Sequence, residues 1–483
     1  MGVLHSVGGL SRRKFITRAM TAGLGLAAGV ALAGCGEAQV VEVVKEVPVE
    51  KIVTQIVEKA VIQEKVVTVQ VEKPQKAVVD LRIGSYVWGD HVIAAYTNII
   101  SQFETRTNYN VRFEYAPSGE FEKKLRTQIA AGNAPDVFMT IPDTVPPLVA
   151  NNQLIDLTEY IKASPVKFDE WYPVSWQALA DRTGQRYYAV PVTFDCEVTF
   201  FNLQKFDEAG AAYPPEDDSW TYDDYVETAL KVTKREGDKI TQWGTTLGWR
   251  PWEQFVEANN GMIFDAWFFY DHPTMNTPEA IGGIQFIADL LHKHKVAAIP
   301  GTSPKGNLFQ SNLAAIGGQE GSWKVQSWGE SLKDFKWDVV MPPLNPTTGR
   351  RPSTGQDNNF SMVKTSKFPD EAWELMYDLG LTEEAQSTLA IALETPAMKK
   401  AAEGPYKEQI LSAAPNGWKV LPVMEFWTTH VPTGYVNQDV WAVEANNLLD
   451  PVWLGTKQAA DAVPEIQTKF EELVAEAKKQ FTY

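Results

Sequence analysis

The feature that most limits the fold of this chain is a regular alternation of two hydrophobic periods that begins at Val79. Strand-like and helix-like apolar spacings follow one another over residues 79–87, 93–103, 111–115, 121–129 and 136–139. This order predicts strand, helix, strand, helix, strand, and Gly132 is a stop signal for the second helix. The pattern is typical of an open α/β sheet whose parallel strands are joined by right-handed crossovers.

The residues that follow each expected strand are candidates for a binding site. In open α/β sheets, ligands bind beyond the carboxyl ends of the strands. Trp88 follows the first expected strand, Glu120 lies just after the second, and Asp143 lies just after the third. We therefore expect these three side chains near one ligand.

The first 35 residues read as an export and lipidation signal. Arg12 and Arg13 lie in a twin-arginine motif, SRRKFI, and an apolar Gly/Ala-rich run leads to the sequence LAGC, which ends at Cys35. The small residues before Cys35 are those that a lipoprotein signal peptidase requires, and the thiol would carry the lipid. A retained membrane helix is the alternative, but the apolar run falls short of the ~20 residues that a span needs.

Residues 36–78 form a low-complexity tract of Val, Ile, Glu, Lys and Gln. The β-branched and charged composition favours an extended stalk that holds the body away from the membrane. A short coiled coil is the alternative, because the apolar spacing lies between the helical and strand periods.

Charge and cysteine content exclude several classes of function. The net charge of −17 and the lack of a basic stripe argue against a nucleic-acid partner. With Cys35 lipidated, Cys196 is the single remaining cysteine, so no internal disulfide is expected and a buried, inert thiol is favoured. His292 and His294 are flanked by lysines and read as a solvated face rather than a metal site. Phosphate-loop, zinc-protease and nucleophile-elbow motifs are absent, so we expect no metal, no cofactor and no catalytic residues.

Short motifs of the body occur in an order that resembles a known family. They are WGD at 88–90, GNAPDV at 132–137, YAVP at 188–191, FFN at 200–202, GSW at 321–323, TGQ at 354–356, SMV at 361–363 and PDEAW at 369–373. From about residue 80 to the C-terminus, the chain resembles the extracellular solute-binding proteins of the maltose-binding type, which are the receptor components of ABC importers. The resemblance implies two α/β lobes with a hinge, and a solute held in the cleft between the lobes.

The resemblance and the strand-end argument together give a set of expected ligand contacts. The set is Trp88, Asp90, Glu120, Asp143, Asp195, Arg250, Trp252, Trp323, Gly355, Tyr435 and Trp441. Asp143 and Asp195 match family carboxylates that bind sugar hydroxyls, and Trp323 matches an aromatic sugar platform. Arg250 stands where maltose binders carry an acid, which permits an anionic or differently hydroxylated solute. Met139 and Thr140 stand where the family carries another aromatic, so the resemblance implies that one stacking surface is missing.

The residue types suit a sugar on physical grounds as well. A flat indole buries the apolar face of a pyranose, and carboxylates or Arg make charge-assisted hydrogen bonds to the hydroxyls. Each assignment has a structural alternative: the tryptophans as core residues, Arg250 as the partner of a carboxylate, and Asp143 and Asp195 as helix caps or residues of solvated turns. The aromatic stretch 267–270 favours packing or a lobe edge.

The predicted architecture is a signal peptide over residues 1–35, a stalk over 36–78 and a two-lobed body over 79–483. Lobe 1 is expected over about 79–193 and 346–394, and lobe 2 over about 196–341 and 397–483, with crossings near 191–195, 341–346 and 393–396.

The predicted function is that of a lipid-anchored, extracytoplasmic, monomeric receptor. It would bind a sugar or related solute and deliver it to an ABC permease, without being an enzyme. A receptor for a polyamine or phosphodiester is the first alternative, and a secreted carbohydrate-active enzyme with two paired carboxylates is the second.

Overall fold

The computed structural model describes residues 79–480, apart from residues 88, 178, 182, 216, 249–250, 302–305, 393 and 428. The described residues fall in one compact unit, Lys76–Tyr483. The predictions for the signal peptide, Cys35 and the stalk lie outside the described residues, and so do those for Trp88 and Arg250.

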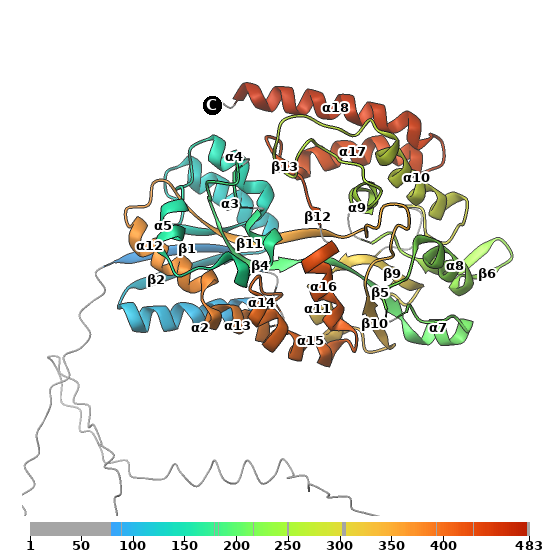
Figure 1. Ribbon diagram of the computed structural model, residues 1–483, viewed down its shortest axis with the longest axis horizontal. Coiled ribbons are helices and arrows are strands. Elements are labelled where there is room, and N and C mark those ends of the chain that lie inside the picture. The colour runs from blue at the N-terminus through green and yellow to red at the C-terminus, as the bar shows by residue number, and fades with distance from the viewer. Residues whose placement is uncertain are drawn as a thin grey trace, which may run out of the picture. The chain divides into compact units, whose positions relative to one another are not determined.

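The body contains two main sheets that lie side by side (Figure 1). The first sheet has the strand order β12-β11-β3-β1-β2, with β4 also paired to β11. Its strands are β1 (Asp80–Tyr86), β2 (Asn110–Ala116), β3 (Val137–Thr140), β4 (Val190–Asp195), β11 (Thr354–Met362) and β12 (Thr429–His430). Strand β1 is parallel to β2 and β3, whereas β11 is antiparallel to β3 and β4. The sheet is therefore mixed, with a parallel part built by the first three strands.

The second sheet has the order β10-β5-β9-β7-β6. Its strands are β5 (Glu197–Asn202), β6 (Lys234–Glu236), β7 (Lys239–Thr245), β9 (Ala314–Gly321) and β10 (Trp337–Val340). A separate two-stranded ribbon joins β8 (Phe268–Tyr270) to β13 (Thr433–Gly434). The α/β class with two sheets, predicted from the sequence, is confirmed.

Helices cover both sheets (Figure 1). On the side of the first sheet they are α2 (Asp90–Thr107), α3 (Ser118–Ala130), α4 (Val145–Ala150), α5 (Thr158–Ala163), α6 (Pro173–Gln177), α12 (Pro369–Met376) and α13 (Glu383–Ile391). On the side of the second sheet they are α7 (Leu203–Ala209), α8 (Tyr222–Val232), α9 (Pro251–Ala258), α10 (Pro278–His292), α11 (Lys324–Ser331), α17 (Gln438–Trp453) and α18 (Ala459–Gln480). Short helices α14 (Lys399–Ala401), α15 (Lys407–Ala413) and α16 (Val420–Pro422) lie low in the middle of the view.

The first five elements form where the apolar periods place them. Helix α2 buries Tyr96, Ile99 and Phe103 on one face, as the helical spacing predicts. It ends at Asn108, whose left-handed backbone (φ 61°) lets its N–H bond to the carbonyl of Glu104. Gly132 also has a positive φ, 68°, just after α3. The predicted order of strand, helix, strand, helix, strand is confirmed.

The chain passes between the sheets at two described places. Strand β4 of the first sheet ends at Asp195 and β5 of the second sheet begins at Glu197, so only Cys196 separates them. The return lies between the end of β10 at Val340 and the start of β11 at Thr354. Cys196 is fully buried and free, as predicted. The exact lobe boundaries stay a prediction.

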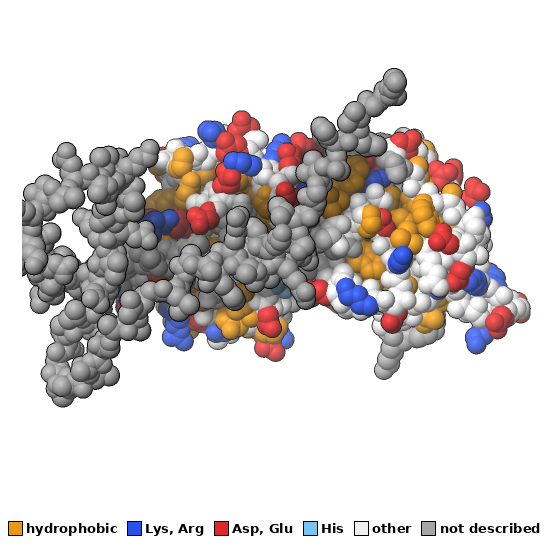
Figure 2. Space-filling view, turned by 90° about the horizontal axis from the view of Figure 1, so that it is seen from below, with side chains coloured by type: hydrophobic (Ala, Val, Ile, Leu, Met, Phe, Trp, Pro, Cys, Tyr) orange, Lys and Arg blue, Asp and Glu red, His pale blue; other side chains and the backbone are white. Residues whose placement is uncertain are grey.

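Acidic and basic side chains are interspersed over the face of the body that Figure 2 shows. Within the described residues, no helix has the length and apolar character to cross a bilayer.

Candidate functional site

The candidate site is built where the first sheet meets the second. Asp143 lies in η1 (Pro142–Thr144), directly after β3, and Asp195 is the last residue of β4. Gly355 is the second residue of β11, in register with His430 of β12. On the other side, Trp323 follows the end of β9 and precedes α11. Strand ends from both sheets therefore supply four of the predicted residues, Asp143, Asp195, Gly355 and Trp323.

Asp195 is the centre of a buried hydrogen-bond network. Its side chain is 6% exposed and accepts hydrogen bonds from Ser322 Oγ (2.9 Å) and Thr395 Oγ1 (3.0 Å). Burial and the nearby charge of Glu394 outweigh these bonds and raise the pKa of Asp195 to about 7. The carboxyl of Asp195 therefore changes charge in the neutral range.

The loop after β9 links this network to Trp323. The N–H of Ser322 donates to the carbonyl of Cys196 (2.8 Å), which fixes the end of β9 against the crossing between the sheets. Trp323 is half-buried, and a Cβ on Gly321 would overlap its six-membered ring. Because residue 321 is a glycine, the indole of Trp323 can lie close over the backbone. Trp323 directly follows Ser322, which donates a hydrogen bond to Asp195.

Asp143 faces the C-terminal part of the chain. It is 6% exposed, and Asn437 Nδ2 donates to its Oδ2 (3.4 Å). It shares a small recess with residues of β11, β12 and the start of α17; the lining is Pro142, Asp143, Gly355, His430, Val431, Thr433 and Gln438. The structure therefore brings Asp143 and Gly355 together.

Buried polar groups next to this recess were missed by the sequence analysis. Both carboxylate oxygens of Asp357 and both amide atoms of Asn359 have no hydrogen-bond partner among the described residues. Burial, with the charge of Asp195, raises the pKa of Asp357 well above its ordinary value, and burial lowers the pKa of His430 to about 3. The available signal was the polar run QDNN at 356–359, which is unusual inside a central strand.

Glu394 and His91 were also missed. His91 Nε2 lies 3.1 Å from Glu394 Oε1, and this hydrogen bond raises the pKa of His91. Glu394 is 4% exposed in its side chain. Because Glu394 also acts on the pKa of Asp195, the start of α2 is coupled to the network through His91.

Two predicted tryptophans lie elsewhere. Trp252 is 2% exposed and Trp441 is fully buried, and their rings pack edge to face at 6.0 Å inside the core under α17. The Nε1–H of Trp252 donates to Asn446 Oδ1 (3.1 Å). Since these rings are enclosed by other side chains, the structure favours a packing role over a sugar platform for both.

The other predicted contacts are more peripheral. Asp90 and Glu120 are exposed in the first turns of α2 and α3. The Tyr435 hydroxyl donates to Asp271 Oδ1 (3.2 Å), and Lys478 lies over the tyrosine ring at 5.1 Å. Tyr435 is therefore tied to neighbours within its own region of the body.

Metal chemistry has no visible support in the part of the chain that the structure describes. No group of three or more His, Cys, Asp or Glu side chains there is arranged to hold a metal ion. The site is a set of carboxyl, hydroxyl and aromatic groups.

Comparisons with known proteins bear on the family and on the fold. Residues 89–387 match the family model described as "Bacterial extracellular solute-binding protein". An arabinooligosaccharide-binding protein of Halalkalibacterium halodurans is 32% identical over 198 residues, which cover 40% of this chain and 41% of that protein. The chain thus aligns with less than half the length of this curated relative.

Solved structures match over far more of the body. An ABC substrate-binding protein from Listeria monocytogenes, in complex with cycloalternan, matches with a TM-score of 0.68 at 22% identity, over 82% of this chain and 99% of that one. A cyclic α-maltosyl-1,6-maltose-binding protein from Arthrobacter globiformis matches with a TM-score of 0.69 at 17% identity, with the same two coverages. At these identities the likeness shows the fold.

Proposed function

Because the chain belongs to the bacterial extracellular solute-binding protein family, we propose that it binds an oligosaccharide between its two sheets and delivers it to an ABC import permease. Membership makes it a binding protein rather than an enzyme, so the carbohydrate-active enzyme considered above is set aside. The main support for an oligosaccharide as the solute lies at the junction of the sheets. There, Ser322 donates a hydrogen bond to Asp195, and Trp323 directly follows Ser322.

The chemistry of this set suits a pyranose. The indole of Trp323 offers a flat apolar surface, and the carboxyl of Asp195 accepts hydrogen bonds from hydroxyl groups. Asp143, which lies just after β3 of the first sheet, supplies a second acceptor. A solute held between the sheets would be desolvated as the two lobes close, which strengthens each of these hydrogen bonds.

A cationic solute such as a polyamine is the second candidate. Asp195, Asp357 and Glu394 are buried acidic groups. Besides burial, Glu394 raises the pKa of Asp195 and Asp195 raises the pKa of Asp357, and an ammonium group placed among them would reverse that effect. The oligosaccharide is preferred because Trp323, a flat aromatic surface, directly follows Ser322, the hydrogen-bond partner of Asp195.

Thermal shift with defined solutes separates the two candidates. We expect arabinotriose, maltotriose or mannotriose to raise the melting temperature of the purified full chain, because a ligand of the folded state stabilises it. If spermidine raises the melting temperature and none of the three sugars does, the polyamine becomes the proposed solute.

A matched pair of variants tests whether binding uses the predicted site. Asp143→Asn should weaken the affinity for the active sugar by roughly tenfold or more, since a hydrogen bond to a charged group contributes about 1.5–3 kcal/mol. Asp334→Asn changes an exposed carboxylate outside the site and should leave the affinity unchanged. Equal affinities in the two variants would remove Asp143 from the site.

We also propose that the protein is exported by the twin-arginine route and anchored through lipid on Cys35. The support is the order of Arg12, Arg13, the short apolar run and the LAGC sequence. Cys35→Ala should release the protein from the membrane fraction, and retention equal to that of the wild type after a carbonate wash would argue against the anchor.

A further inference from the structure

We propose that Glu197 is a positioning residue for solute binding, because its buried carboxylate joins two of the segments that cross between the sheets. The first crossing runs from β4 to β5 through Cys196, and the return ends where β11 begins at Thr354. Glu197 is fully buried, so it acts on a solute only through these segments. The inference rests on the proposed function and adds to it a residue that sets affinity from outside the site.

Hydrogen bonds link Glu197 to the return through both its side chain and its backbone. Thr354 donates from its backbone N–H to Oε2 and from its Oγ1 to Oε1 (3.1 Å). Ser353 Oγ accepts from the N–H of Glu197 (3.2 Å) and donates to its carbonyl (3.0 Å). Glu197 begins β5 of the second sheet and Thr354 begins β11 of the first, so these bonds tie one sheet to the other.

The residues before Glu197 extend the connection to the third predicted crossing. The N–H of Phe194 donates to the carbonyl of Thr395 (2.9 Å), and the hydroxyl of Thr395 donates to Asp195. Glu197 lies on the other side of Cys196 and holds the second crossing. The short stretch from Phe194 to Glu197 therefore holds both of the other segments in place.

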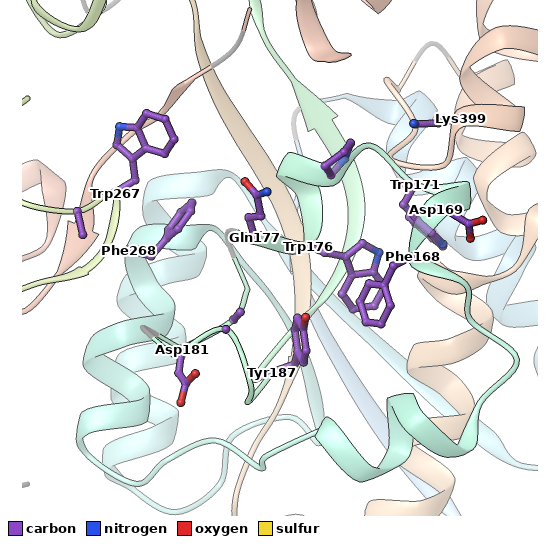
Figure 3. A pocket seen from close by; sticks show the side chains of 14 residues that line it. Phe168, Asp169, Trp171, Trp176, Gln177, Asp181, Tyr187, Trp267, Phe268 and Lys399 are labelled. Atoms are coloured by element: carbon purple, nitrogen blue, oxygen red, sulfur yellow. The ribbon is translucent and has the colours of Figure 1, made fainter. Parts of the chain in front are cut away.

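The crossings separate the two sides of a cavity of about 820 Å³ (Figure 3). Trp176 and Tyr187 line it from the part of the chain before the first crossing, and Trp267 and Phe268 line it from the part after the crossing. Because the crossings connect these two parts, their arrangement sets how far apart the facing side chains lie. A residue that fixes the crossings therefore fixes the width of the space between the sheets.

Both oxygens of Glu197 are used, which makes glutamine a sharp test of the carboxylate. Each oxygen accepts from a different donor of Thr354. A glutamine has the same size, but its NH₂ group must face one of these donors. A buried donor without an acceptor destabilises the arrangement that contains it, so Glu197→Gln favours other arrangements of the crossings. A solute must then restrict a wider range of arrangements, which weakens its binding.

Electron paramagnetic resonance distances in the solute-free protein give the first measurement. The full chain carries Cys35→Ala, with nitroxide labels on Lys123→Cys of α3 and Asn447→Cys of α17, two exposed positions on the two sides of the crossings. Cys196 is fully buried and takes no label. We expect Glu197→Gln to broaden or displace the distance distribution relative to the same chain with Glu197.

Asp136→Asn is the matched control. Asp136 also accepts from one backbone N–H, that of Arg82 (2.9 Å), and from one hydroxyl, that of Ser366 (2.7 Å). All three residues belong to the first sheet or to its connections, and Asp136 directly precedes β3, at the end of the strand opposite to Asp143. The control should lose stability without changing the distance distribution or the affinity.

Thr354→Val is a milder variant that keeps the proposal testable if Glu197→Gln does not fold. It removes the hydroxyl donor and leaves the backbone N–H of Thr354 in place. We expect it to change the distance distribution in the same direction as Glu197→Gln. The double variant should change it by less than the sum of the two single effects, since both act on one set of bonds.

Calorimetric titration and stopped-flow mixing with arabinotriose, maltotriose and mannotriose give the second measurement. For a sugar that binds the parent chain, Glu197→Gln should raise the dissociation constant per folded molecule by roughly two- to thirtyfold, as substitutions that act on a site without touching its ligand do. Asp136→Asn should leave the constant unchanged.

Two results would overturn the role of Glu197. One is a distance distribution that is the same in the parent, Glu197→Gln and Thr354→Val. The other is a changed distribution with an unchanged affinity. If no sugar binds the parent but Glu197→Gln still broadens the distribution, the oligosaccharide fails while the control of the crossings by Glu197 stands, so the two failures are distinguishable.

Discussion

Two tryptophans that the sequence treats alike lie in opposite surroundings. Trp323 follows Gly321 and Ser322 at the end of β9, is half-buried, and adjoins the hydrogen-bond network of Asp195. Trp441 lies within α17, is fully buried, and packs edge to face on Phe264 (5.6 Å) and Phe470 (5.7 Å). A loop that places an indole beside polar groups can serve a ligand, whereas an indole surrounded by rings serves the fold.

The largest effect that we expect comes from the packed indole. Trp441→Ala should lower the free energy of unfolding by about 3–5 kcal/mol, because it leaves a cavity among Phe264, Phe470 and Trp252. Affinity for the solute, measured per folded molecule, should be unchanged. Urea denaturation and calorimetric titration of this variant check both parts, and weaker binding by the folded fraction would place Trp441 at the site after all.

The sequence could not separate these two residues because burial depends on distant partners. Phe264 and Phe470 pack on Trp441; Phe264 lies far from α17 in the sequence, and Phe470 lies on the next helix, α18. By contrast, the early strands and helices follow from local apolar periods, and their parallel arrangement follows from the connections between them.

Long-range strand pairing explains what else was missed at the site. The polar residues Asp357 and Asn359 belong to β11, which crosses into the first sheet and pairs with β3 and β4. Nothing local in the sequence indicates that these side chains are buried together with His430 and Asp195.

The pH dependence of stability gives the second-largest expected effect, and it probes the polar region alone. The pKa of Asp195 is raised from 3.8 to about 7 in the folded state because burial and Glu394 disfavour its charged form. The folded protein therefore holds a proton that the unfolded chain loses. The resulting stabilisation is fully present below about pH 4 and is lost as the pH rises through about 7, by at most about 1.4 kcal/mol per pH unit.

Comparison with Asp195→Asn isolates this contribution. The variant cannot titrate at position 195, while the neighbouring acidic side chains Asp357 and Glu394 are present in both proteins. Urea denaturation at about pH 4.5 and pH 8 should therefore show a larger loss of stability with rising pH in the wild type than in the variant. Parallel losses in the two proteins would mean that Asp195 is ionised throughout this range.

The smallest expected effect on stability, and the sharpest on binding, belongs to Trp323. Trp323→Ala should weaken solute binding by about 1–3 kcal/mol, by analogy with the stacking of bases on aromatic side chains, which is roughly ten- to a hundredfold in dissociation constant. Its half-buried ring and its loop position predict a much smaller change in unfolding free energy than that of Trp441→Ala. Titration and thermal unfolding of the two alanine variants, made side by side, give opposite outcomes if the comparison holds. A Trp323→Ala variant that loses several kcal/mol of stability but keeps its affinity per folded molecule would make Trp323 a packing residue. The proposal that the solute is an oligosaccharide would then be supported by family membership alone.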